Sequence, residues 1–237
     1  MFTLSPDEIT IIQLSLRVAF WSVVASLPPA VLVAHVLARR RFPGKSLLDA
    51  VVHLPLVLPP VVVGYFLLIL LGTQGPVGRL LEDWFGIVVA FRWTGAAIAC
   101  AAMGFPLMVR AIRLSIDAID PKLESAAETL GAGRIAIFFS VTLPLALPGI
   151  VTGTLLSFAR SLGEFGATIT FVSNIPGETQ TLPLAIYAFT QVPGGDAQAL
   201  RLCVISIVLS VAALLASEAI VRRATRRSMG YDAVGRG

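Results

Sequence analysis

Residues 123–131 read LESAAETLG and, after nine further residues, residues 141–144 read VTLP. This polar stretch separates two long apolar runs. Asp120, with a proline directly after it, can cap a helix, and Gly131 can provide the left-handed residue that ends it. A second, amphipathic segment follows at residues 134–142. We therefore predict two short helices joined at a glycine elbow, a shape that the cleft of a partner protein can hold.

The composition of the chain is that of a membrane protein. Hydrophobic residues make up 56% of its 237 residues, charged residues only 14%, and the mean hydropathy is +0.86; a soluble domain of this size carries more charge. Because a helix needs about 20 apolar residues to cross a bilayer, we predict an all-α polytopic membrane protein with five transmembrane helices. The expected spans are residues 9–38, 47–72, 95–112, 147–172 and 200–221.

The basic residues predict how the chain is oriented. Most of the 18 lysine and arginine residues follow the first, third and fifth spans, whereas Arg79, Arg92 and Arg201 are expected on the other side. The positive-inside rule then places the N-terminus outside and the C-terminus in the cytoplasm. The excess of basic residues, with a pI near 9.6, is explained by the orientation of the chain in the membrane and by contact with lipid headgroups. We therefore expect no nucleic-acid partner.

Three regions follow from this arrangement. We expect residues 1–8 to form an external N-terminal cap, residues 9–221 a membrane domain with its polar loop at residues 120–144, and residues 222–237 a basic cytoplasmic tail. Within the cap, Ser5 and Glu8 have the spacing of a capping box that begins the first helix.

Prolines interrupt the second expected span. Pro55, Pro59 and Pro60 lie within six residues of one another, and proline inside a helix removes a backbone hydrogen bond and bends it. We therefore predict a broken helix. In membranes such breaks occur at gates and substrate sites, although packing alone is the alternative explanation.

Two opposite charges lie inside the fourth expected span. Arg160 and Glu164 are four residues apart, which places them on one face of a helix, and ionisable groups at this depth are costly unless they are paired or hydrated. One interpretation is that they line a path for an anion, with Glu164 weakening the hold of Arg160. The other is a structural ion pair, and the two are compatible.

A loop without basic residues lies between the fourth and fifth spans. It contains Asn174, Pro176 and Gly177 and continues into an apolar stretch that reaches Tyr187. We expect a loop followed by a short re-entrant or gate helix on the outside, suited to a docking partner. A simple connection is the alternative, but the segment is longer than a hairpin requires.

Nothing in the sequence indicates an enzyme. Gly44-Lys45-Ser46 resembles the end of a phosphate-binding loop, but Arg39 occupies the position that requires glycine. We therefore expect no ATP binding by this chain, no cofactor, no metal site and no catalytic residues. Cys100 and Cys203 are interpreted as small packing residues.

Seven residues of the polar stretch share the spacing of a known loop. Glu124, Ala126, Ala127, Gly131, Val141, Leu143 and Pro144 match in register the cytoplasmic coupling loop of binding-protein-dependent ABC importer permeases. The two small alanines would let the surface of an ATPase subunit approach the backbone closely. The chain resembles this family; the alternative, an ordinary solvated loop, does not explain the register.

Three further stretches are similar to the oxyanion branch of the family, and most of all to its molybdate permeases. They are residues 42–49 with the proline-rich second span, residues 159–166 and residues 171–187. The resemblance implies a type I permease fold in the bacterial cytoplasmic (inner) membrane. It also implies a homodimer that works with two cytoplasmic ATPase subunits and an external molybdate-binding protein.

Three alternative functions stay open. A sulfate or tungstate permease of the same family would look alike, because these substrates are all tetrahedral dianions. A proton-coupled secondary transporter could use Glu164 or His53 as a relay, but it would have no use for a coupling loop. A membrane-embedded enzyme would need a catalytic constellation, which the sequence does not display.

Overall fold

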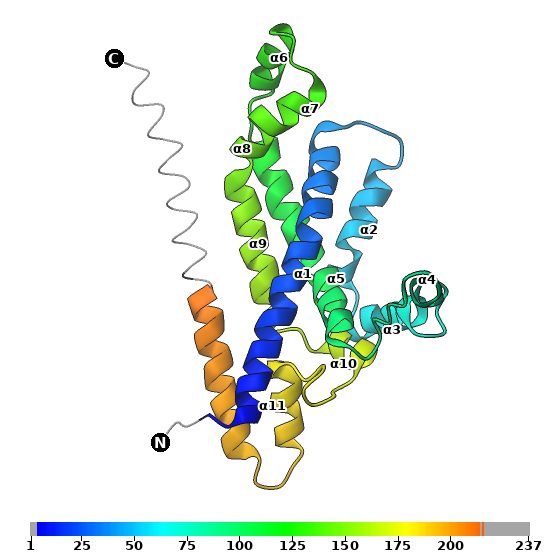
Figure 1. Ribbon diagram of the computed structural model, residues 1–237. Helices are drawn as coiled ribbons and strands as arrows, with labels where there is room; N and C mark the ends of the chain where they lie inside the picture. The colour runs from blue at the N-terminus through cyan, green and yellow to red at the C-terminus, as the bar shows by residue number, and fades with distance from the viewer. Residues whose placement is uncertain (1–3, 214, 216–237) are drawn as a thin grey trace.

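The computed structural model describes residues 4–213 and 215 as a long helical bundle (Figure 1). The elements are α1 (Pro6–Arg39), α2 (Lys45–Val57), α3 (Pro60–Leu71), α4 (Pro76–Phe85), α5 (Trp93–Asp117), α6 (Pro121–Thr129), α7 (Arg134–Ile137), the π-helix η1 (Phe138–Thr142), α8 (Leu143–Leu145), α9 (Leu147–Leu162), α10 (Gly166–Val172), α11 (Leu182–Thr190) and a last helix described over Asp196–Ala213. Helices α6 and α7 lie at one end of the bundle, and α11 and the start of α1 lie at the other.

The number of membrane crossings agrees with the prediction. Pro6–Arg39, Trp93–Asp117 and Asp196–Ala213 are each long and apolar enough to span a bilayer. Two bent pairs, Lys45–Val57 with Pro60–Leu71 and Arg134–Leu145 with Leu147–Leu162, bring the number to five if each pair is one span. The second pair begins inside the predicted polar loop and ends at Leu162, so it matches the fourth expected span, residues 147–172, only in part. The predicted tail, residues 222–237, and the end of the fifth expected span lie outside the described residues.

The start of α1 is fixed by the expected capping box and by the last helix. The Ser5 Oγ accepts a hydrogen bond from the backbone N–H of Glu8 at 3.2 Å, and the Glu8 carboxylate accepts one from the Ser5 N–H at 2.8 Å. The same carboxylate, whose side chain is 1% exposed, pairs with Arg201 at 2.9 Å. The first and last described helices are therefore joined by one buried glutamate.

Small residues bring α1, α5 and α9 together in the centre of the bundle. A Cβ atom on Gly104 of α5 would clash with Ser157 of α9, and one on Gly149 would clash with Ser115. Close approach at small residues is the usual way in which membrane helices pack. Cys100 is buried against the Ser161 carbonyl of α9, which agrees with its interpretation as a packing residue.

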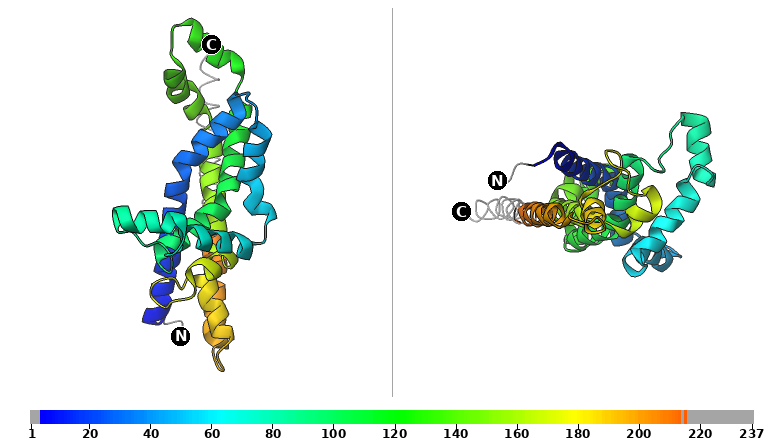
Figure 2. Two further views of the ribbon diagram at one scale, coloured as in Figure 1. Left: turned by 90° about the vertical axis from the view of Figure 1, so that its right-hand side faces the viewer. Right: turned by 90° about the horizontal axis from the view of Figure 1, so that it is seen from below.

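The second span is broken, as predicted, at Pro59 and Pro60. Helix α2 ends at Val57, and α3 starts at Pro60 and leaves at 115° to α2. Pro55 lies inside α2 without ending it, so the break involves two of the three prolines. Helices α3 and α4 project to one side of the bundle (Figure 2). Helix α4 was not among the predicted elements.

The prediction that residues 147–172 form one continuous helix was wrong. Helix α9 ends at Leu162, and α10 starts at Gly166. The cause is local: the Glu164 carboxylate accepts the backbone N–H of Ala167 at 2.8 Å and begins a new helix. A Cβ on Gly166 would lie 2.8 Å from the Pro60 side chain, so the break in the fourth span packs directly on the break in the second.

A candidate functional site at the tip of the bundle

The first arm of the polar stretch is a short helix with caps at both ends. The Asp120 carboxylate accepts the backbone N–H of Lys122 at 2.9 Å and begins α6. Gly131 has a φ of +83°. Its N–H reaches the carbonyl of Glu128 at 2.9 Å, and the N–H of the next residue reaches that of Ala127 at 3.0 Å. These two bonds are the Schellman pattern, so the predicted helix and glycine elbow are confirmed.

The second arm is helical but not uniform. Residues 134–142, expected as one amphipathic segment, form α7 and then one turn of π-helix, η1. Single π turns inside helices occur frequently at functional sites. Val141 lies in η1, and Leu143 and Pro144 lie in α8, where they join the hairpin to α9. We call residues 120–144 the hairpin.

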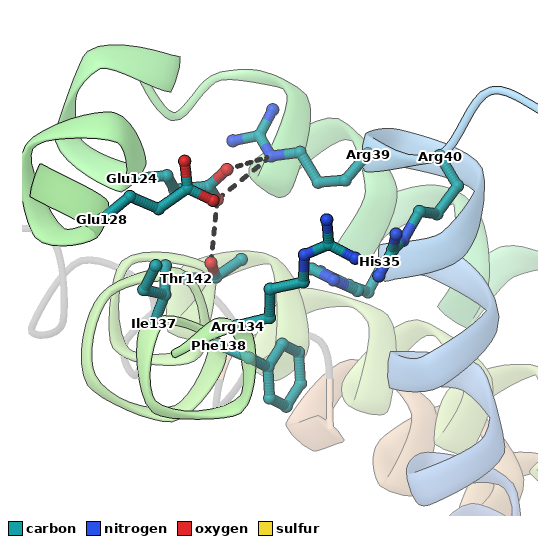
Figure 3. A pocket seen from close by; sticks show the side chains of 9 residues that line it. All are labelled: His35, Arg39, Arg40, Glu124, Glu128, Arg134, Ile137, Phe138 and Thr142. Atoms are coloured by element: carbon teal, nitrogen blue, oxygen red, sulfur yellow. Dashed lines mark hydrogen bonds and ion pairs between the residues drawn. The ribbon is translucent and has the colours of Figure 1, made fainter. Parts of the chain in front are cut away.

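Glu124 ties the two arms of the hairpin to the end of α1 (Figure 3). Arg39 Nε lies 3.1 Å from each carboxylate oxygen of Glu124, and the Thr142 hydroxyl donates to the same carboxylate at 2.8 Å. Arg39 also donates to the carbonyl of Ile119 at 3.2 Å. The Glu124 side chain is only 20% exposed. Its carboxylate therefore engages the protein itself and holds the hairpin against the end of α1.

The other side of the hairpin exposes apolar side chains. Leu130, Ile135 and Phe139 are 89%, 76% and 61% exposed. Ala126 is exposed beside them and Ala127 is half-buried. Large apolar side chains with this exposure on a short hairpin are typical of an interaction surface, and the Glu124 contacts hold the hairpin in place.

Arg160 and Glu164 meet at the contact between the two broken spans. Arg160 Nη1 lies 2.6 Å from Glu164 Oε2, and the side chains are 29% and 1% exposed. Glu164 also begins α10, which packs on Pro60 through Gly166. The structure thus brings the pair to the break at Pro59 and Pro60, whereas Pro55 lies one helix turn earlier, within α2.

The three residues expected at an outer docking surface lie at the opposite end of the bundle from the hairpin. Pro176 and Gly177 line a cavity of about 330 Å³ against the start of α1. Asn174 points into the protein, where its amide donates to the carbonyl of Leu184 at 3.4 Å. The short helix expected after this loop is present as α11.

Sequence reasoning missed Arg39 and Thr142 as partners of Glu124. Arg39 is one of the basic residues that follow the first span, and its separation of 85 positions from Glu124 left no local signal. Within residues 4–213 and 215, no cluster of three His, Cys, Asp or Glu side chains could hold a metal ion.

Long apolar helices, two broken spans and a tethered hairpin with an apolar outer surface define the class of this protein: a transmembrane subunit of a multi-subunit transporter. Residues 27–226 match the family described as binding-protein-dependent transport system inner membrane component, and the chain belongs to this family. The predicted non-catalytic permease subunit with several membrane spans is thereby confirmed.

Several characterised permeases are similar along nearly their whole length. The molybdenum transport system permease protein ModB of Escherichia coli (strain K12) is 59% identical over 95% of this chain and 98% of its own length. ModB of Haemophilus influenzae is 57% identical over 93% of this chain and 96% of its own length. The sulfate transport system permease protein CysT of Salmonella typhimurium is 35% identical over 96% and 81%.

Solved structures confirm the fold. A bacterial ABC transporter that imports the acidic polysaccharide alginate has a TM-score of 0.71 at 18% identity, covering 93% of this chain and 80% of that one. The MetNI methionine ABC transporter has a TM-score of 0.65 at 17% identity, and the match covers 91% of this chain and 93% of that one. The predicted all-α ABC permease fold is therefore confirmed.

Glu124→Gln is expected to loosen the hairpin without unfolding the bundle. The ion pair with Arg39 is lost, which for a partly exposed pair costs about 1 kcal/mol, so hydrogen exchange of the α6 and α7 amides should rise about fivefold. Glu128→Gln is the matched control, because Glu128 lies one turn further along α6 and makes no ion pair with another described residue. Equal exchange in both variants would contradict the tethering role.

Proposed function

We propose that the chain is the permease subunit of an ATP-driven importer that moves molybdate across the bacterial cytoplasmic membrane by alternating access. A separate ATPase subunit supplies the energy. The observation that carries the proposal is the hairpin: Leu130, Ile135 and Phe139 present an apolar surface, while Glu124 anchors the opposite side to α1. An ATPase cleft that holds this surface moves the membrane helices whenever it closes.

The route of that motion follows from the covalent and polar connections of the hairpin. On one side Glu124 and Arg39 link it to the end of α1; on the other, α8 continues into α9. At the far end of α9, the Arg160–Glu164 pair reaches α10, which packs on α3. When the ATPase subunits close, the movement of the hairpin is therefore transmitted to both broken spans through helices and the polar contacts between them. Alternating access requires such a coupling.

The similarity of the relatives supports molybdate as the substrate. Permeases named for molybdenum transport are 59% and 57% identical to this chain, and a sulfate permease is 35% identical. Sulfate is the second candidate, with tungstate, because each is a tetrahedral dianion. A proton-coupled transporter is not favoured, because it has no ATPase subunit that the hairpin would contact.

The proposed assembly is a homodimer with two cytoplasmic ATPase subunits and an external molybdate-binding protein. The binding protein docks where Pro176 and Gly177 line the cavity beside α1. Asn174 supports that surface from within through its contact with α11. In this assembly Ala126, Ala127 and the exposed apolar residues face the ATPase, and Val141, Leu143 and Pro144 connect it to α9.

The proposed orientation, N-terminus outside and C-terminus inside, is tested by reporter fusions. A reporter active only in the cytoplasm should be active when fused after Arg227 and silent when inserted near Gly177. Gly177 lines a cavity with the start of α1, which lies at the opposite end of the bundle from α6 and α7 (Figure 1), and this supports the expectation that the hairpin and Gly177 face different compartments. The reverse pattern of activity would overturn the orientation.

Uptake of labelled molybdate into vesicles tests the function. With both partner proteins present, uptake should require ATP and should resist competition by sulfate. Gly131→Val should leave the permease in the membrane but weaken binding of the ATPase and uptake, because a β-branched residue at a φ of +83° is strained.

Gly133→Val is the matched control for the glycine elbow. Gly133 is two residues away, has a φ of −72°, and a Cβ atom there meets nothing within 4 Å. Uptake should therefore survive in this variant. Uptake without ATP would refute the ATPase partnership, and full competition by sulfate would assign the chain to the sulfate branch.

We propose that the translocation path passes Arg160 and Glu164 at the break formed by Pro59 and Pro60. Pro55, about one helix turn before the break, is proposed to bend α2 beside this path. A dianion in a low-dielectric path needs compensating positive charge. The Arg160 side chain is 29% exposed and Glu164 is 1% exposed, so the arginine is the member that a substrate can reach. Glu164 then limits how tightly Arg160 holds the anion.

Arg160→Ala should reduce transport sharply and destabilise the protein by about 3 kcal/mol, because it strands a buried carboxylate. Glu164→Gln should keep the fold, since its amide oxygen still accepts the Ala167 N–H, and should alter turnover. Replacing Arg160 by methionine together with Glu164→Gln, which keeps the acceptor for the Ala167 N–H, should restore stability but not transport. Transport restored by the double replacement would show that the pair is structural and does not line the path.

A further inference from the structure

A cavity of about 190 Å³ separates the hairpin from the end of α1 (Figure 3). Its charged and titratable lining residues are His35, Arg39, Arg40, Glu124, Glu128 and Arg134. The tethering role of Glu124 explains only part of this set. Arg40, Arg134 and His35 take no part in the function proposed above.

The charges in this cavity are separated into two halves. Glu124 is held by Arg39 and Thr142, and Figure 3 shows Glu128 beside it on the α6 side. On the other side, the guanidinium groups of Arg40 and Arg134 extend toward each other next to His35. Among the residues that the structure describes, no carboxylate lies within ion-pair distance of either arginine.

This half of the cavity has the groups that bind a phosphate. Two guanidinium groups that converge repel each other unless an anion lies between them, and their forked donors match phosphate oxygens. The His35 Nδ1 is buried and has no hydrogen-bond partner among the described residues. A buried polar atom without a partner is uncommon.

The position of the cavity indicates where the phosphate comes from. Arg40 directly follows α1, the first membrane span, on the side of the bundle where the proposed orientation places the cytoplasm. Basic pockets on the cytoplasmic side of membrane helices bind the headgroups of acidic lipids. The volume is also sufficient, since it is about six times the ~30 Å³ that one water molecule takes up in liquid water.

We propose that the cavity between α1 and the hairpin binds the phosphate group of an acidic phospholipid. Arg40 belongs to the end of α1 and Arg134 to the start of α7. The headgroup therefore joins the hairpin to the membrane domain at a second point, in addition to the contact between Glu124 and Arg39. This inference does not depend on which substrate is transported.

The test uses the full-length permease in nanodiscs of two compositions, phosphatidylcholine alone and an equal mixture with phosphatidylglycerol. The mixed lipid should raise the thermal unfolding midpoint, and native mass spectrometry should find phosphatidylglycerol retained on the protein. The double variant Arg40→Gln/Arg134→Gln should lose both effects, with an affinity lower by about fivefold for each arginine removed.

Arg41→Gln is the matched control. Arg41 is the next residue of the same basic run and is exposed, but it does not line the cavity. It should retain phosphatidylglycerol as the wild-type protein does. Equal losses in the control and in the double variant would overturn the proposal, because they would indicate general attraction to an acidic surface.

Inorganic phosphate separates the two possible sources of the group. Added to the permease in phosphatidylcholine, it should stabilise the wild-type protein less than the acidic lipid does, and it should not stabilise the double variant. Stabilisation by inorganic phosphate with no retained lipid would overturn the lipid source. If neither inorganic phosphate nor phosphatidylglycerol stabilises the wild-type protein, the cavity is not a phosphate site. Both arginines would then be assigned to the interface with the ATPase.

Discussion

A break in a membrane helix frees backbone groups that the bilayer cannot hydrogen-bond, so protein must cover it. This constraint explains the centre of the bundle. The break between α2 and α3 and the break between α9 and α10 lie against each other at Pro60 and Gly166. Glu164 accepts one of the freed N–H groups, that of Ala167. Each broken span thus shields the other, and neither is expected to be stable alone.

Three glutamates follow one pattern in this chain. Glu8 and Glu124 lie in the first turns of α1 and α6, and Glu164 directly precedes α10. Each carboxylate is near the positive end of a helix, and each also pairs with an arginine, namely Arg201, Arg39 and Arg160. Each of these acidic residues therefore lies at a helix start and joins that helix to another element, and Glu8 and Glu164 also accept a backbone N–H there.

The sequence predicted what depends on neighbouring residues and missed what depends on distant ones. Asp120 and Gly131 determine the ends of α6 through contacts within a few positions, so the hairpin was predictable. The end of α9 is the exception, since the Glu164 carboxylate that accepts the Ala167 N–H is a local signal and the break within residues 147–172 was nevertheless not predicted. The Arg39–Glu124 contact joins residues 85 positions apart, and no local sequence pattern indicates it.

The contact between Glu8 and Arg201 has a consequence for biosynthesis. The two residues are 193 positions apart, so the ribosome makes nearly the whole chain before the arginine that neutralises Glu8 exists. Until Arg201 is made, the Glu8 carboxylate has only its local contact with the Ser5 N–H. The last helix completes the ion pair when it enters the membrane, which makes its arrival the step that distinguishes a finished permease from a truncated one.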